Sequence, residues 1–307
     1  MKKLLVLICL WVIILQAEAQ QQAMFTHYSF NTISVNPGYA GSRGALTAVL
    51  LHRSQWINFP GAPTTQTFTL HTPLYHERIG VGLSVLNDKI GPTHQTSYYV
   101  DLAYKIPMGK GKFAFGLKGG VNSIKHEISD LTTTQANDPS FQEDYYSELL
   151  PNFGVGLYYS TVKYYVGLST PRLLETDFTT NTAGHAGKDQ RHYFFIAGAI
   201  FPLNSTGTLK LRPSTFVKVT EGVPIEFDIT ALVYIRDFIW AGAMYRLGDA
   251  TGALVGLNIT EQLSLGYSYD WSFTNSTGKY NAGSHEVILR YDFFFTEKGK
   301  IRSPRYF

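Results

Sequence analysis

The sequence predicts an all-β protein: a transmembrane, antiparallel, up-and-down β-barrel of about 14 strands with both termini in the periplasm. Three observations lead to this prediction. One stretch alternates strictly with period two, the connections divide into long and short sets, and the composition is unusual. Only 16% of the 307 residues are charged, whereas 14% are aromatic. So little charge cannot cover an ordinary globule, and alternation of apolar and polar residues explains how mean hydropathy stays near zero.

The alternation is clearest in residues 261–273. Large apolar or aromatic residues alternate there with small or polar ones: Leu263, Leu265, Tyr267, Tyr269, Trp271 and Phe273. A strand with this pattern places all large groups on one face. In a membrane barrel that face meets lipid and the polar face lines the lumen, whereas in a soluble sandwich it packs on a second sheet. The Tyr and Trp residues favour the membrane, because these side chains settle at its interfaces.

The first element is a predicted signal peptide, residues 1–19. Lys2 and Lys3 precede an apolar run of about twelve residues, and Ala17 and Ala19 suit cleavage before Gln20. The alternative is a transmembrane helix, but the run is shorter than the roughly twenty residues that a helix needs. The chain's one cysteine, Cys9, lies in this run, so the mature protein is predicted to contain no thiol.

The barrel is predicted over residues 44–295, between an N-terminal arm or plug (20–43) and a C-terminal tail (296–307). Fourteen stretches share the length and alternation of membrane strands. They are 44–54, 64–74, 79–88, 95–107, 111–125, 151–160, 162–171, 191–203, 207–220, 224–235, 237–247, 252–260, 262–273 and 284–295.

The connections between these strands predict the orientation. Taken alternately, one set is mostly long and includes 55–63, 89–94, 126–150, 172–190 and 274–283, although 221–223 and 248–251 are short. The other set consists of tight turns. Because membrane barrels have short periplasmic turns and longer external loops, the long set is predicted to lie outside the cell.

Charged residues within the predicted strands fall on the face opposite the large apolar groups. They are Asp101, Lys105, Lys118, Glu226, Asp228, Asp270, Arg290 and Asp292. On a lipid face each basic group would cost roughly 2 to 4 kcal/mol at mid-bilayer. We interpret these charges as a ladder that stabilises the lumen, in preference to a substrate path.

The sequence contains no recognisable catalytic or cofactor motif. The nine histidines are scattered without metal-ligand spacing, and no nucleophile elbow, phosphate loop or dinucleotide fingerprint is present. The glycine pairs Gly80/Gly82 and Gly154/Gly156 lie inside strands, where they relieve crowding in the lumen or let the sheet curve. A net charge of +3 without a basic run does not indicate a nucleic-acid partner. We therefore expect a protein that is not an enzyme and binds no cofactor, metal or nucleic acid.

Both ends of the mature chain carry distinctive motifs. They are Met24 to Asn31 (MFTHYSFN), Val35 to Ser42 (VNPGYAGS), Arg53 to Trp56 (RSQW), Phe59 to Thr64 (FPGAPT) and Ser303 to Phe307 (SPRYF). Together they resemble the PorP/SprF family of Bacteroidota outer-membrane proteins, in which the second motif is usually INPAYAG. The resemblance covers the whole mature chain.

The resemblance implies an outer-membrane β-barrel of the type IX secretion system and, in many members, of gliding motility. Such a barrel accompanies a secreted surface protein or adhesin, usually with a type-B C-terminal domain, and holds it at the cell surface. A periplasmic peptidoglycan-binding lipoprotein, the ring and motor components and outer-membrane lipid are the other implied partners. The alternative function is a passive pore or solute channel, because a barrel with an open lumen would conduct.

Candidate partner-binding residues occur in both terminal segments. The arm, residues 20–43, is predicted to start in the periplasm, where it plugs the lumen, docks a partner, or packs against its own barrel with a turn at Asn36-Pro37-Gly38; its candidates are Asn36, Pro37 and Tyr39. The tail is predicted to bind a periplasmic partner or to remain solvated; its candidates are Arg302, Arg305, Tyr306 and Phe307.

Further candidates lie in the long loops, which either hold the exported partner or only cap the barrel. In the two longest loops they are Asp138, Glu143, Asp144, Glu148 and Arg172. In the first loop they are Gln55, Trp56, Phe59 and Pro63. Trp56 has an alternative role as an interfacial anchor of the outer aromatic girdle.

Overall fold

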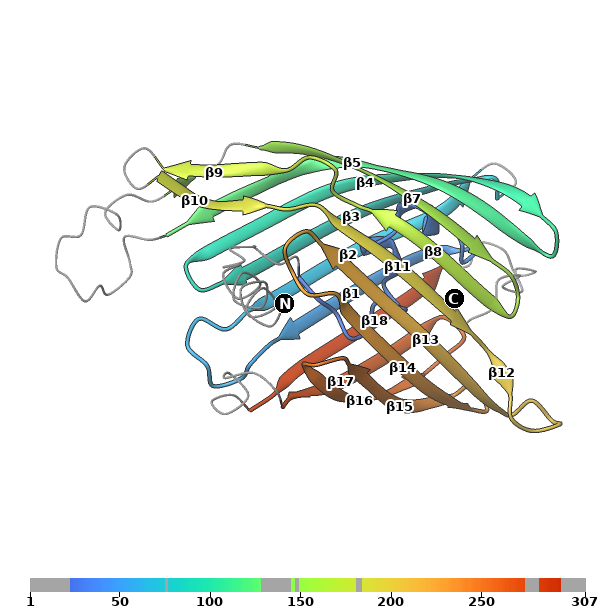
Figure 1. The fold of residues 1–307 in the computed structure, drawn as a ribbon. Helices are drawn as coiled ribbons and strands as arrows, with labels where there is room; N and C mark the ends of the chain where they lie inside the picture. The colour runs from blue at the N-terminus through green and yellow to red at the C-terminus, as the bar shows by residue number, and fades with distance from the viewer. Residues whose placement is uncertain are drawn as a thin grey trace, which may run out of the picture.

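The computed structural model describes residues 23–74, 77–127, 145–146, 149–180, 184–273 and 282–293. Fourteen antiparallel strands form a closed ring, in which each strand pairs with the next along the chain and the last pairs with the first (Figure 1). The predicted all-β, up-and-down barrel of about 14 strands is thereby confirmed. The predicted signal peptide and tail lie outside the described residues.

All fourteen predicted strands are present. The ring consists of β1 (Leu46–Ser54), β2 (Thr64–Leu74), β3 (Ile79–Ile90), β4 (Thr93–Met108), β5 (Gly111–His126), β7 (Leu150–Ser160), β8 (Tyr164–Thr170), β11 (His192–Ala199), β13 (Leu209–Thr220), β14 (Glu226–Ile235), β15 (Ile239–Arg246), β16 (Ala250–Asn258), β17 (Leu263–Ser272) and β18 (Ser284–Phe293). Short additions are β6 (Tyr145–Tyr146) on β5, β12 (Phe201–Pro202) on β13, and a hairpin of β9 (Thr176–Thr180) and β10 (Gly184–Asp189).

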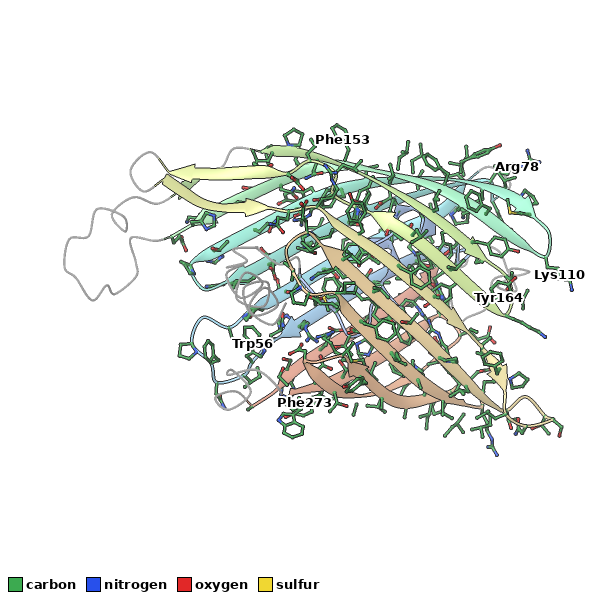
Figure 2. All side chains as sticks on the ribbon, in the orientation of Figure 1. Trp56, Arg78, Lys110, Phe153, Tyr164 and Phe273 are labelled. Carbon is green, nitrogen blue, oxygen red and sulfur yellow. The ribbon has the colours of Figure 1, made fainter. Side chains whose placement is uncertain are left out.

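The connections distinguish the two ends of the barrel. We call the end with connections 55–63, 127–149 and 171–191 the loop end, and the end with turns 109–110, 161–163 and 236–238 the turn end. Figure 2 shows Arg78, Lys110 and Tyr164 together at the turn end and Trp56 toward the loop end.

One predicted long connection is instead a tight turn. Residues 89–94 were expected to form a loop, but Ile90 pairs with Thr93, so only two residues join β3 to β4. The extended parts of these strands are polar on both faces, as Asp88, Lys89 and His94 illustrate. A strand that rises into water needs no apolar face, and the period-two signal is therefore lost there.

The outer and inner faces of the ring differ as the alternation predicts. Outward side chains of β17 such as Leu265, Tyr267 and Trp271 are exposed, whereas the inward Ser268 and Asp270 are buried. The same division extends around the barrel, and the predicted inward charges face the lumen. The outer surface is therefore apolar and rich in aromatic groups, as a lipid-facing surface must be.

The lumen is filled by the segment before β1, residues 23–43, which we call the plug. It contains two single-turn 3-10 helices, η1 (Thr32–Ser34) and η2 (Pro37–Tyr39). Its apolar side chains belong to the hydrophobic core of the barrel, and Tyr28, Ile33 and Tyr39 are at least 98% buried. No helix in the described part of the chain is long and apolar enough to cross a membrane.

Glycines on the inner face let the plug approach the wall. A Cβ added to Gly80 of β3 would lie 1.9 Å from the Ala40 carbonyl oxygen, and one added to Gly116 of β5 would lie 2.1 Å from the Gly38 nitrogen. Both neighbours are backbone atoms that cannot rotate away. Gly80 thus relieves crowding, which is one of the two roles predicted for it, and the plug is what approaches both glycines.

A pair of glycine substitutions in one strand tests the fit of the plug. We expect Gly116→Val to lower the free energy of unfolding by about 3 kcal/mol, because overpacking against fixed backbone must displace η2. Gly119→Val is the matched control: it lies three residues along β5, and its Cβ would meet only ring atoms of Phe153, at 3.8 Å or more. We expect it to change stability by less than about 0.5 kcal/mol. The measurement is the temperature at which the folded barrel loses its resistance to SDS, and equal values for both variants would contradict this account of the plug.

Candidate functional site at the loop end of the barrel

Buried polar contacts fix the start of the plug to the ring. Glu286 on β18 accepts hydrogen bonds from the backbone nitrogens of Thr26 at 2.9 Å and His27 at 2.7 Å, and its Oε1 lies 2.8 Å from Nδ1 of His27. Nη1 of Arg53 on β1 lies 2.7 Å from the Asp270 carboxylate and 3.1 Å from that of Glu286. The hydroxyl of Thr26 also donates to Asp270. This cluster joins the plug to β1, β17 and β18 at once.

The middle of the plug is held by groups from several strands. Arg212 on β13 donates to the Ser29 carbonyl at 3.1 Å, and its guanidinium lies 4.9 Å from the centre of the Phe30 ring. On the other side, Asn31 is hydrogen bonded to the hydroxyls of Thr67 and Thr69 at 2.9 Å each. Contacts on opposite walls prevent the plug from leaning to one side and leaving a path through the lumen.

The end of the plug is fixed by a bidentate ion pair. Arg43 donates to both carboxylate oxygens of Asp292 on β18, at 3.1 and 2.7 Å, and the Thr47 hydroxyl donates to the same carboxylate at 2.6 Å. Two parallel bonds of this kind fix the orientation of both groups as well as their distance. The Arg43 guanidinium keeps its charge throughout the physiological pH range.

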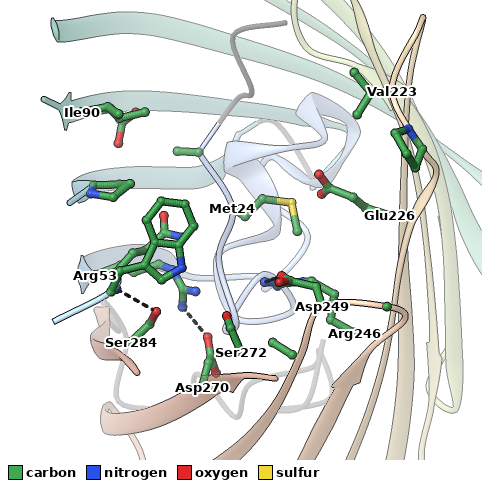
Figure 3. A pocket seen from close by; sticks show the side chains of 18 of the residues that line it. Met24, Arg53, Ile90, Val223, Glu226, Arg246, Asp249, Asp270, Ser272 and Ser284 are labelled. Carbon is green, nitrogen blue, oxygen red and sulfur yellow. Dashed lines mark hydrogen bonds and ion pairs between the residues drawn. The ribbon is translucent and has the colours of Figure 1, made fainter. Parts of the chain in front are cut away.

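A cavity of about 650 Å³ remains above the start of the plug, at the loop end (Figure 3). We call it the mouth cavity. Its floor includes Met24 together with Arg53 and Asp270, which belong to the cluster around Glu286 described above. Further inside, next to η1, a pocket lined by Lys118 has a volume of only about 20 Å³. In the part of the chain that the structure describes, the plug therefore fills the middle of the lumen, and the larger space lies at the loop end.

The mouth cavity combines a charged interior with an apolar rim. Arg246 pairs with Asp228 at 2.8 Å and lies 3.7 Å from Asp249, while Ile90 and Val223 stand at the opening. On the floor, Nε of Arg53 and Oδ1 of Asp270 are buried and have no hydrogen-bond partner among the residues that the structure describes. Both atoms are enclosed by their neighbours, so the floor contributes the charges of the two side chains to the cavity.

Trp56 is held at the rim in an uncommon backbone conformation. Its φ is 47°, and Asn58 has a φ of 70°. A bulky residue with positive φ costs of order 1–3 kcal/mol and persists only where its surroundings impose it. Here the Trp56 nitrogen donates to the Ser284 hydroxyl at 3.2 Å, and Ile57 exchanges two backbone hydrogen bonds with residues 282 and 283. The loop is therefore fixed, with the Trp56 side chain lining the cavity.

The structure brings together several of the predicted partner-binding residues. Gln55, Trp56, Pro63 and Arg172 line the mouth cavity, and the Phe59 ring meets that of Trp56 edge-on at 6.3 Å. The first loop and the long loop after β8 thus contribute to one site, although 116 positions separate Trp56 from Arg172.

The other candidates are elsewhere. Asn36, Pro37 and Tyr39 lie inside the plug, where the Asn36 side chain donates to the Leu157 carbonyl at 3.0 Å and accepts from the Gly38 nitrogen at 2.9 Å. They hold the plug in the barrel, and a partner contact for them stays a prediction. Eight candidates are outside the described residues: Asp138, Glu143, Asp144, Glu148, Arg302, Arg305, Tyr306 and Phe307.

Sequence reasoning missed four charged residues that anchor the plug. Arg53, Glu286, Arg212 and Arg43 were not proposed as site residues. For the first three a signal existed, because each is a charge at a lumen-facing position of a predicted strand, and Arg53 lies directly opposite Glu286 in the β1–β18 register. In the ranges that the structure covers, no group of three His, Cys, Asp or Glu side chains is placed to hold a metal ion.

A closed antiparallel ring with an apolar outer surface and a charged, plugged interior defines a membrane β-barrel protein. The family model described as "Type IX secretion system membrane protein PorP/SprF" matches residues 17–291. The chain belongs to this family, as its terminal motifs predict.

Similar solved structures are distant in sequence. The outer membrane protein Omp33 of Acinetobacter baumannii is 9% identical, with 82% of this chain and 100% of that chain covered and a TM-score of 0.49. OmpF of Salmonella typhi is 9% identical, with coverage of 82% and 98% and a TM-score of 0.37. No curated protein matches the chain.

Proposed function

We propose that this barrel lies in the outer membrane, with its loop end outside the cell, and holds a protein exported by the type IX system at the surface. It performs no catalysis. The exported protein is a surface protein or adhesin with a type-B C-terminal domain, as the family resemblance suggests. The observation that carries the proposal is the combination of a plugged lumen with a roomy cavity at the loop end.

The plug argues against the alternative of a passive pore. Contacts with Arg212 and through Asn31 tie the plug to opposite walls of the barrel. Solutes that entered the mouth cavity would meet the packed residues of the first half of the plug. The cavity itself suits an extended segment or a side chain of a partner. Its apolar rim can bury hydrophobic groups and its charged floor can fix their orientation, as in other protein binding sites.

The turn end is proposed to face the periplasm and to contact the remaining machinery. Described basic residues there include Arg78, Lys110, Lys112 and Lys163. Together with the tail, this end is the proposed contact for a peptidoglycan-binding lipoprotein and for the ring and motor components. A gliding role belongs to the same proposal and depends on which adhesin the barrel holds.

A comparison of two tryptophans tests the proposed grip. We expect Trp56→Ala to weaken retention of the exported protein about 30-fold, because loss of an aromatic hot-spot contact typically costs at least 2 kcal/mol of binding. The exported protein should then appear in the medium. Trp271→Ala is the matched control, since Trp271 is 53% exposed on the outer face of β17 near the same end.

The measurement is the ratio of exported protein on cells to that in the medium, with equal amounts of barrel in the membrane. Identification of the protein that co-purifies with the parent barrel from native membranes gives the partner. Equal retention by both variants would exclude Trp56 from the grip, and a barrel that co-purifies with no exported protein would contradict the proposed function.

A further inference from the structure

The direction of the plug is set by its two ends. Ala23 and Met24 line the mouth cavity, together with loop-end residues such as Trp56 and Asp249. Figure 3 shows Met24 and Asp249 at this cavity. At the other end of the plug, Arg43 is paired with Asp292, next to the point where Leu46 pairs with Phe293. That point is the turn end. The plug therefore runs through the lumen from the loop end to the turn end, and β1 then returns to the loop end.

The beginning of the plug is fixed in this direction by its backbone. The nitrogens of Thr26 and His27 both donate to one buried carboxylate, Glu286, three to four residues from the start of the described segment. Phe25 is 5% exposed and packs in the barrel core, whereas Ala23 is only partly buried and borders the cavity. Ala23, the first residue that the structure describes, therefore lies on the cavity side of the barrel.

The number of residues before Ala23 limits how far the amino terminus of the mature protein can lie from the mouth cavity. Cleavage before Gln20 leaves three residues in front of Ala23, and three residues span at most about 11 Å. The hydrocarbon core of a bilayer is about 30 Å thick. The new amino terminus therefore cannot return to the turn end, whichever path it takes.

We infer that the mature chain emerges through its own barrel and presents its amino terminus at the mouth cavity, while β18 directs the carboxyl-terminal tail to the opposite end. The two termini then lie on opposite sides of the membrane. This differs from the sequence-based expectation that the arm starts in the periplasm. Combined with the proposed orientation, on which this part rests, the amino terminus is at the cell surface, and Ala23 and Met24 form part of the surface that an exported polypeptide meets.

Single cysteines test this topology, because the mature chain is predicted to contain none and serves as the blank. The variants are Gln21→Cys near the amino terminus, Glu221→Cys in a loop-end connection and Lys110→Cys in a turn at the opposite end. Glu221 and Lys110 are exposed. Intact cells are treated with a membrane-impermeant maleimide, before and after the outer membrane is permeabilised. SDS resistance confirms that each variant is folded.

We expect the Gln21→Cys and Glu221→Cys variants to be labelled in intact cells, and the Lys110→Cys variant only after permeabilisation. If Gln21→Cys behaves like Lys110→Cys, or is labelled under neither condition, the inference is wrong. If instead Gln21→Cys and Glu221→Cys are both protected until permeabilisation and Lys110→Cys is labelled in intact cells, the amino terminus still lies at the mouth. That result would overturn the proposed orientation, and with it the proposed function, but not the path of the chain.

Discussion

Glu286→Gln is expected to lower the free energy of unfolding by about 3–5 kcal/mol, the typical cost of removing one partner from a buried ionic cluster. Glu286 is fully buried and takes part in four contacts, with two plug nitrogens, the His27 ring and Arg53. Glutamine keeps the shape but loses the charge, and its NH2 group would face donors instead of acceptors. The start of the plug should then detach from β18.

The matched control is Glu77→Gln at the turn end. Glu77 pairs with Lys112 at 2.6 Å, but both side chains are well exposed, at 39% and 50%. An exposed pair of this kind contributes at most about 1 kcal/mol. The temperature at which SDS resistance is lost should fall clearly for Glu286→Gln and little for Glu77→Gln. Similar values for both variants would mean that Glu286 does not anchor the plug.

The ring itself could be predicted because its physics is local. Apolar and polar side chains alternate along a lipid-facing strand, so β17 can be predicted from residues 263–272 alone. The number and direction of the strands follow from repetition of that pattern. The prediction failed at residues 89–94, where strands β3 and β4 extend beyond the membrane into water. Polar residues on both faces carry no periodic signal there.

The plug could not be placed from sequence because nothing in it is periodic. Residues 23–43 mix aromatic, polar and small groups in two short helical turns and extended chain. Their environment comes from the surrounding ring, which supplies partners far along the chain: His27 meets Glu286, and Asn36 meets Leu157. Such contacts depend on how the ring closes and in which register, and an individual strand contains neither piece of information.

The mouth cavity was predictable in part for the same reason. Gln55, Trp56 and Pro63 were selected because a loop beside the first strand was expected to face outward, and Arg172 because it opens a long loop. Their convergence on one cavity follows from the closed ring. The charged floor beneath them could not be predicted without knowing the position of the plug, which brings Thr26 against Asp270 and Arg53.

Deletion of residues 23–41 is expected to turn the closed barrel into a conducting pore. Eight-stranded barrels are filled by their own side chains, whereas rings of sixteen to eighteen strands enclose a water-filled channel. A ring of fourteen strands lies nearer the second case, and here a segment of the chain occupies the space. The deletion keeps Arg43 and its ion pair with Asp292, so β1 can still start in register.

Charges on the strands indicate how such a pore would behave. The buried acidic residues on the described ring strands are Asp88, Asp101, Asp228, Asp270, Glu286 and Asp292; the buried basic residues are Arg53, Lys105, Lys118, Arg212, Lys218, Arg246 and Arg290. Six acids and seven bases give a nearly balanced lumen once water replaces the plug. We therefore expect weak selectivity between anions and cations.

Single-channel recording in planar bilayers measures both properties. The parent barrel and Gly119→Val should conduct little, and the deletion should raise conductance by about tenfold or more. Gly116→Val and Glu286→Gln keep the full chain but loosen the plug, so they should show brief openings. If the deletion variant does not fold, these two variants test whether the plug blocks conduction. A parent protein that conducts as well as the deletion variant would show that the plug leaves the lumen open, and the passive-pore function would then replace the anchoring function.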